Sequence, residues 1–143
     1  MSVLAPPLEE LLDGQVVGVM ATESGDGRPR QSVVYYAREG DRLLVSSVAG
    51  RAKVRDVERN GWASLCVMSP RPPFPSATFS GAAGVLTEQI GPATAAVAQH
   101  VMGAAEPPEA QSEEALAAAG RVIVAISIER VSAATHLDQL RSG

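Results

Sequence analysis

The chain has 143 residues, enough for one domain to bury a core without disulfides or a structural metal. Its formal charge of −4 argues against general affinity for nucleic acid or for an anionic membrane surface. The single cysteine, Cys66, cannot form an internal disulfide. The N-terminal residues do not read as a basic segment followed by an apolar run and a cleavage site, and no apolar run is long enough to span a membrane. We therefore expect one domain over residues 1–143, located in the cytoplasm, with no nucleic-acid or membrane partner.

The first third of the sequence alternates short apolar segments with turn residues. Residues 6–12 are typical of a short helix that stops near Gly14. Strands are predicted at 15–22, 29–36 and 43–47, separated by the turn sequences Ser-Gly-Asp-Gly and Glu-Gly-Asp. Because these connections are too short for parallel crossovers, the sheet must begin as an antiparallel meander.

The remainder of the chain adds three more strands around two helical segments. A helix is predicted over 51–59, strands over 62–68, 77–86 and 122–128, and a second helix over 92–102 that ends at Gly103. The acidic stretch 106–120 is loop, helix or both, and the proline-rich segment 69–75 cannot join a sheet. Six antiparallel strands with two or three short helices predict a mainly β protein, a small β-barrel.

Positive charge gathers where the third strand meets the following helix. Two hydroxyls and a flexible glycine precede the cations, and a helix start adds free backbone N–H groups, a combination suited to an anion such as phosphate. The residues concerned are Ser46, Ser47, Gly50, Arg51, Lys53, Arg55 and Arg59. The alternative is an ordinary solvated helix face, in which Asp56 and Glu58 pair with neighbouring arginines.

Other familiar catalytic patterns are missing from the sequence. There are only two histidines and one cysteine, and the sequence contains no HxxxH, CxxC or DxD spacing, so no metal site is expected. The nucleophile motif GxSxG and the phosphate-binding motifs GxGxxG and GxxxxGKS do not occur. Cys66 is expected to be a small buried hydrophobe and His100 a surface or half-buried helix residue. No catalytic residue is identified, so an enzymatic activity would depend on a phosphorylated organic cofactor.

The few aromatic residues bear on how a planar ring could be held. Trp62 and Phe79 are expected in the core, and Tyr35 and Tyr36 must point to opposite faces of their strand. A bound ring would therefore lie mainly against aliphatic side chains and backbone.

Four segments together resemble a known family over residues 15–131, approximately. They are GDGRPRQSVVYY, LLVSSVAGRAKVRDVERN, FSGAAGVL and RVIVAISIERV. They are similar to the pyridoxamine 5'-phosphate oxidase-like superfamily, and within it to the actinobacterial branch that binds the deazaflavin coenzyme F-420. The resemblance implies a six-stranded antiparallel split β-barrel of the FMN-binding type. It also implies a homodimer in which the partner chain completes each cofactor site.

The same resemblance implies a set of cofactor-binding residues. Three residues of the second strand would run beside the ring, two serines would end the third strand, and the helix start would hold the phosphate. In this sequence they are Gln31, Ser32 and Val33; Ser46 and Ser47; and Arg51, Ala52 and Lys53. The family often has asparagine where Asp56 stands, so Asp56 either weakens the anion site or forms a salt bridge within it.

The implied activity is hydride transfer between coenzyme F-420 and a small conjugated organic substrate. Arg28 and Arg30, beside the hairpin turn, are candidates to meet the acidic tail of this coenzyme. One alternative is an FMN-dependent reductase or oxidase of the pyridoxamine-phosphate-oxidase type. Another is a protein that binds flavin, F-420 or haem without turnover, and a third is a structural or interaction protein without cofactor affinity.

Overall fold

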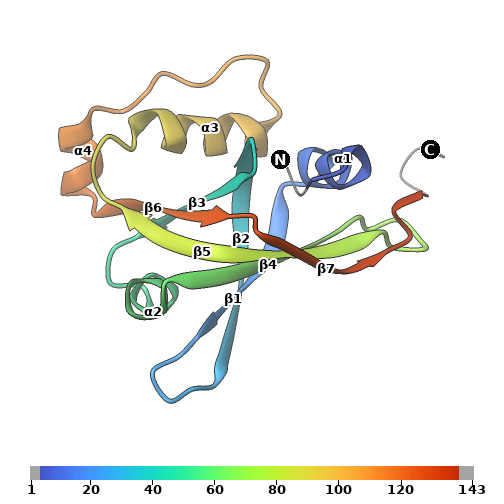
Figure 1. The fold of residues 1–143 in the computed structure, drawn as a ribbon. Coiled ribbons are helices and arrows are strands. Elements are labelled where there is room, and N and C mark those ends of the chain that lie inside the picture. Colours follow the sequence, from blue (N-terminus) through green and yellow to red (C-terminus); the bar gives the residue numbers. More distant parts are fainter. Residues whose placement is uncertain (1–3, 139–143) are drawn as a thin grey trace.

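Six antiparallel strands close into a barrel in the computed structural model, which describes residues 4–138 (Figure 1). The strands are β1 (Val17–Glu23), β2 (Pro29–Glu39), β3 (Arg42–Val48), β4 (Trp62–Met68), β5 (Ser76–Leu86) and β6 (Arg121–Ser127). Their order is β4-β1-β2-β3-β6-β5, and pairing of β4 with β5 closes the circle. The expected six-stranded antiparallel barrel is confirmed.

The structure adds one strand and resolves the helices. A seventh strand, β7 (Arg130–Thr135), pairs with the first half of β5 on the edge that β6 leaves free. Sequence patterning missed β7 because its residues are mostly small and exposed, without apolar alternation. The helices are α1 (Pro6–Gly14), α2 (Ala52–Asn60), α3 (Gly91–Met102) and α4 (Glu113–Ala118). The acidic stretch is thus a loop followed by α4.

Apolar side chains fill two separate cores. The barrel interior holds alternate strand residues and is covered by buried leucines of α1 and by Val54 and Val57 of α2. A second cluster lies between α3, α4 and the outer face of β3 and β6, where Leu44 and Ile123 meet Val97 and Leu116. Figure 1 shows α3 and α4 above the β3 and β6 side of the barrel, and α2 below it. Among residues 4–138, no helix has the length and apolar character needed to cross a lipid bilayer.

Strand phase decides which of the predicted core residues are buried. Phe79 is fully buried as expected, and Tyr36 is buried while Tyr35 is exposed on the opposite face. The predictions for Cys66 and Trp62 were wrong, since Cys66 is exposed and 40% of Trp62 is accessible. In β4 the interior positions belong to alternate residues such as Leu65, so the positions in between face outward.

Gly81 marks the point where β5 meets the corner between β6 and β7. A Cβ atom added to Gly81 would lie 1.9 Å from the carbonyl oxygen of Ser127. The corner is also tied to β5 by Glu129, whose backbone N–H donates to Ser80 O at 2.9 Å and whose carboxylate accepts from Ala82 N at 3.2 Å. Glycine at this position therefore allows the chain to pass from β6 to β7 across β5.

Candidate functional site

Strands β2 and β3 separate beside the barrel. Their ladder contains only the pairs from Tyr36↔Val45 to Glu39↔Arg42. Beyond it, the first part of β2 pairs with β1 alone, and residues Ser46–Val48 of β3 pair with β6 alone. Figure 1 shows β2 running down towards the β1–β2 turn while β3 runs to the side, with α2 in the angle between them. This separation leaves backbone groups on the facing edges of β2 and β3 outside the ladders.

A tight turn connects the open end of β3 to the start of α2. The N–H of Arg51 donates to Val48 O at 3.3 Å, and Gly50 adopts the positive φ of 87° that this turn requires. Among the described residues, no backbone acceptor is found for the N–H groups of Ala52 and Lys53, as expected for the first turn of a helix. We call Arg51–Lys53 the helix-start segment. Its amides and the positive end of the helix dipole favour an anion.

Arg51 and Lys53 are cations for which residues 4–138 provide no anionic partner. No ion pair or side-chain hydrogen bond to another residue within 4–138 is found for either side chain. Burial of the half-buried Lys53 lowers its pKa, and repulsion from the Arg51 guanidinium lowers it further. A lysine whose charge is disfavoured by burial and by a neighbouring guanidinium would gain from a bound anion. Arg59 on α2, in contrast, forms an ion pair with Asp56.

Ser46 and Ser47 lie on opposite faces of β3. Ser47 is 6% exposed and points with Val45 into the barrel, whereas Ser46 faces outward, where its Oγ accepts a hydrogen bond from the Arg121 guanidinium at 2.5 Å. The two hydroxyls therefore cannot contact one phosphate from the same side. Sequence reasoning missed Arg121 because only the β3–β6 register brings it next to Ser46, 75 residues earlier in the chain.

The implied ring-binding residues lie in the part of β2 that has left β3. We call Gln31–Val33 the β2 edge segment. Gln31 and Val33 face outward, Val33 with 72% of its surface exposed, and Ser32 is half-buried on the inner face. A planar group lying along this edge would meet backbone amides and the side chain of Val33.

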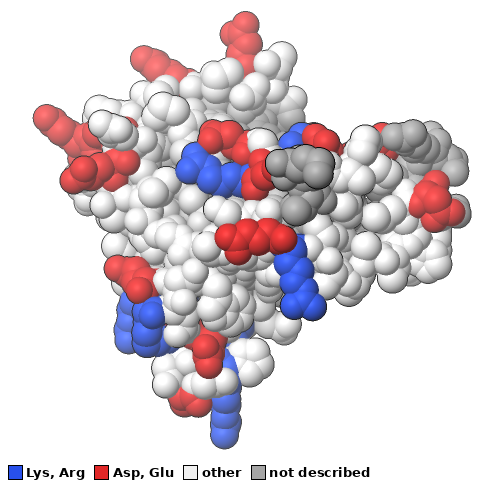
Figure 2. Space-filling view, viewed as in Figure 1, with Lys and Arg blue, Asp and Glu red and all other residues white. Residues whose placement is uncertain are grey.

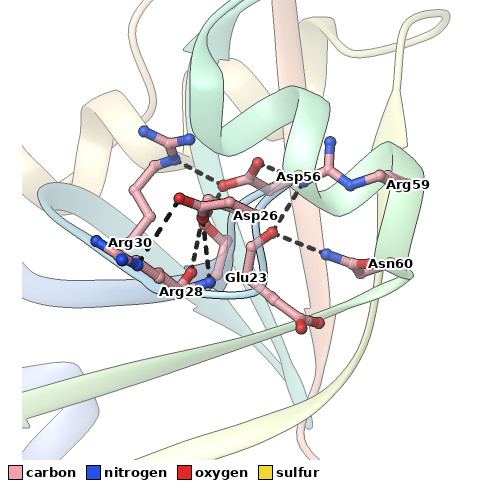
Figure 3. A network of polar contacts seen from close by, with 9 residues as sticks. Glu23, Asp26, Arg28, Arg30, Asp56, Arg59 and Asn60 are labelled. Carbon is pink, nitrogen blue, oxygen red and sulfur yellow. Dashed lines mark hydrogen bonds and ion pairs between the residues drawn. The ribbon is translucent and has the colours of Figure 1, made fainter.

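Asp56 connects the β1–β2 hairpin to α2 (Figure 3). The carboxylate is 2% exposed and accepts hydrogen bonds from Thr22 Oγ1 at 2.7 Å, Arg30 Nε at 2.8 Å and an Arg59 NH2 group at 2.8 Å. Burial alone would raise the pKa of Asp56, but these three hydrogen bonds outweigh it, so the pKa lies below its usual value. Asp56 therefore forms salt bridges with Arg30 and Arg59, which is one of the two roles that the sequence left open for it.

The hairpin arginines already have carboxylate partners. Arg28 lies 3.9 Å from Asp26, and Arg30 pairs with Asp56. Both arginines line a hollow of about 360 Å³ beside the β1–β2 turn. Figure 3 shows how their side chains lie relative to Asp26 and Asp56. Within residues 4–138, no group of three or more His, Cys, Asp or Glu side chains is placed to hold a metal ion.

An apolar face covers the outside of β1, β2 and β4. The register pairs Val17 with Tyr35 and Val19 with both Val33 and Cys66, so these side chains are neighbours. All five are exposed, Tyr35 by 59%. We call this set the outer β face. Its composition is unusual for a solvent-exposed surface and typical of an interface.

Charged side chains are distributed unevenly over the surface. Figure 2 shows acidic side chains standing out from the upper edge, over α3, α4 and the segment between them, and groups of basic side chains lower down near α2 and the β1–β2 turn. The segment 103–120 contains four glutamates and no lysine or arginine. The positive field needed for an anion is therefore local to α2 in a chain whose net charge is −4.

Several solved structures share the fold of this chain. The structure is similar to that of an F-420 reductase, with 24% identity, a TM-score of 0.69, and coverage of 87% of this chain and 94% of that one. An FAD-binding protein from Mesorhizobium loti matches with 24% identity, a TM-score of 0.65, and coverage of 92% and 94%. An FAD- and haem-binding protein from Mycobacterium smegmatis matches with 19% identity, a TM-score of 0.72, and coverage of 91% and 70%.

These likenesses establish the fold, and the sequence itself supplies the family. No curated protein sequence matches the chain. The family model described as pyridoxamine 5'-phosphate oxidase, however, matches residues 4–134, nearly the whole chain. The protein is therefore a member of the pyridoxamine 5'-phosphate oxidase family.

Proposed function

We propose that the protein is a cytoplasmic oxidoreductase that holds coenzyme F-420 and acts on a small conjugated organic substrate; FMN is the alternative cofactor. When bound, the deazaflavin or flavin ring supplies the hydride chemistry. The helix-start segment binds the phosphate, together with Ser47 or Ser46, and the β2 edge segment orients the ring through its backbone groups. No residue of this chain is assigned as acid or base.

The observation that carries this proposal is that Arg51 and Lys53 have no anionic partner in the described part of the chain. Lys53 is half-buried, has no carboxylate partner in the described chain and is repelled by Arg51, yet it lies at a helix start. Such an arrangement is costly unless an anion occupies it. Family membership and the F-420 reductase among the structural neighbours support a phosphorylated redox ring as that anion.

Side-by-side titration tests the proposal. The purified protein is titrated with F-420, with FMN and with the phosphate-free forms of the two rings, and binding is followed by fluorescence or absorbance of the ring. We expect at least one phosphorylated ring to bind about tenfold or more tightly than its phosphate-free form, because the phosphate contributes charge-assisted hydrogen bonds. Failure to bind either phosphorylated ring would contradict the proposal.

The outer β face supports a homodimer as the working form. A twofold interface brings one surface patch against the same patch of a second copy. The five side chains that define this face are uncharged, so the face can pack against itself without repulsion between like charges. Val33 belongs to both this face and the β2 edge segment. The partner chain would therefore cover the ring and complete the site.

Val19→Arg is expected to convert this dimer to a monomer. The new guanidinium would be buried opposite an apolar patch without a partner, which costs several kcal/mol. Sedimentation velocity measures the assembly, and the reaction rate of Cys66 with a thiol reagent should rise as its shield is lost. Ala110→Arg, which adds the same charge on an exposed loop, is the matched control. A monomeric wild-type protein at tens of micromolar would contradict the dimer.

A binding protein without turnover is the second candidate. The similarity to the FAD- and haem-binding protein of Mycobacterium smegmatis favours it, because that fold is used there for binding. An assay with the reduced cofactor and a panel of quinones and unsaturated ketones separates the two candidates. Tight cofactor binding without oxidation of the reduced ring in the presence of any acceptor would favour the binding role.

A further inference from the structure

Asp56 is a buried carboxylate on which three elements converge. Its donors come from β1 (Thr22), β2 (Arg30) and α2 itself (Arg59), all within 2.8 Å. Around it, the Arg59 guanidinium and the Asn60 amide both donate to the backbone oxygen of Glu23, at 3.0 and 2.8 Å. Figure 3 shows Asp56 between the two guanidinium groups, with Arg59 and Asn60 reaching the end of β1. We call these contacts the Asp56 clasp.

The Asp56 clasp joins the two parts of the proposed cofactor site. Arg30 immediately precedes the β2 edge segment, and Asp56 lies three residues, nearly one helical turn, after Lys53. A strand and a helix are not joined by backbone ladder hydrogen bonds. The side-chain hydrogen bond from Arg30 to Asp56 is therefore a direct link between β2 and α2. A displacement of α2 relative to β2 would break it.

The chemistry of position 56 suits this role better than an amide would. A carboxylate offers two oxygens that accept from three donors and neutralises one of the two guanidinium charges beside it. An asparagine keeps the size but offers one oxygen and turns an N–H₂ group towards cations. The carboxylate thus fixes the position of α2 on the hairpin.

We propose that Asp56 is a positioning residue that keeps the helix-start segment at the distance from the β2 edge segment that a phosphorylated ring needs. This inference rests on the proposed function. A ring without phosphate uses the β2 edge segment alone. Loss of the clasp therefore weakens binding of the phosphorylated ring selectively.

The test compares FMN with riboflavin in the wild type and in Asp56→Asn. We expect the Kd for FMN to rise about tenfold and the Kd for riboflavin by less than about threefold, so that the preference for FMN falls several-fold. The same comparison is made with F-420 and its phosphate-free core. Circular dichroism at the titration temperature establishes that the variant is folded.

Two further variants complete the design. Asp13→Asn removes a carboxylate that is likewise hydrogen-bonded to an arginine, Arg38, but lies on α1, so both affinities should stay at wild-type values. Arg30→Gln breaks the same clasp from the β2 side and remains informative if Asp56→Asn does not fold. The double variant should lose no more FMN affinity than Asp56→Asn alone, because both changes act on the same contact between Arg30 and Asp56.

The outcomes separate this inference from the proposed function. If the wild type binds neither FMN nor F-420, both fail together. If the wild type binds a phosphorylated ring but Asp56→Asn and Arg30→Gln keep the wild-type preference over the phosphate-free ring, Asp56 has only a structural role and this inference alone is overturned. A lower melting temperature with an unchanged preference has the same meaning.

Discussion

Lys53→Ala is expected to weaken binding of the phosphorylated cofactor by about 1.5–3 kcal/mol, which is about tenfold to a hundredfold or more in Kd. The lysine is half-buried, and burial together with Arg51 lowers its pKa, so its charge is disfavoured unless an anion is bound beside it. A phosphate would repay that cost through a charge-assisted hydrogen bond. The ring without phosphate should bind Lys53→Ala as it binds the wild type.

The same substitution is expected to have the opposite effect on the stability of the protein measured without added cofactor. Removing a desolvated cation next to another cation relieves repulsion, so the melting temperature without cofactor should stay the same or rise. Arg71→Ala is the charge-matched control, because this exposed arginine lies on the loop between β4 and β5, away from α2 in Figure 1. Unchanged FMN and F-420 affinities in Lys53→Ala would remove the lysine from the site. A loss of stability would instead indicate a structural role.

Gly81→Ala is expected to destabilise the fold by about 3 kcal/mol or more, a shift of about 10 °C in melting temperature for a chain of this size. The added Cβ would lie 1.9 Å from Ser127 O, and the backbones of Gly81 and Ser127 are both held in sheet pairing. Relief therefore requires β5 or the β6–β7 corner to move, which breaks the contacts of Glu129 with β5.

Gly84→Ala is the matched control for this prediction. Gly84 lies in the same strand three residues later, and an added Cβ there meets no atom within 4 Å. The control should be neutral or slightly stabilising, because alanine restricts the unfolded chain more than glycine does. Urea unfolding of both variants measures the difference. Equal stability of the two variants would show that the corner adapts without cost, contrary to the contact seen at Gly81.

The sequence alone determined the strands, the turns and the class of fold. Alternation of apolar residues and turn chemistry are local signals, so the six barrel strands, the buried Phe79 and the opposite faces of Tyr35 and Tyr36 could be predicted directly. The basic helix start was also visible, because Arg51 and Lys53 are close in the chain. That no carboxylate within the described residues pairs with them could not be predicted, because it depends on where acidic residues distant in the sequence lie.

Tertiary structure decided the features that depend on register between distant strands. Arg30 meets Asp56 across 26 positions and Arg121 meets Ser46 across 75, and no local pattern encodes either contact. The outward position of Cys66 follows from the phase of β4, which is set by its pairing with β1 and β5. The weakly apolar β7 is a strand only because β5 offers it a free edge. Local chemistry therefore specified the elements of this protein, and their packing specified which charges are paired, which are left for a ligand and which apolar face is left uncovered.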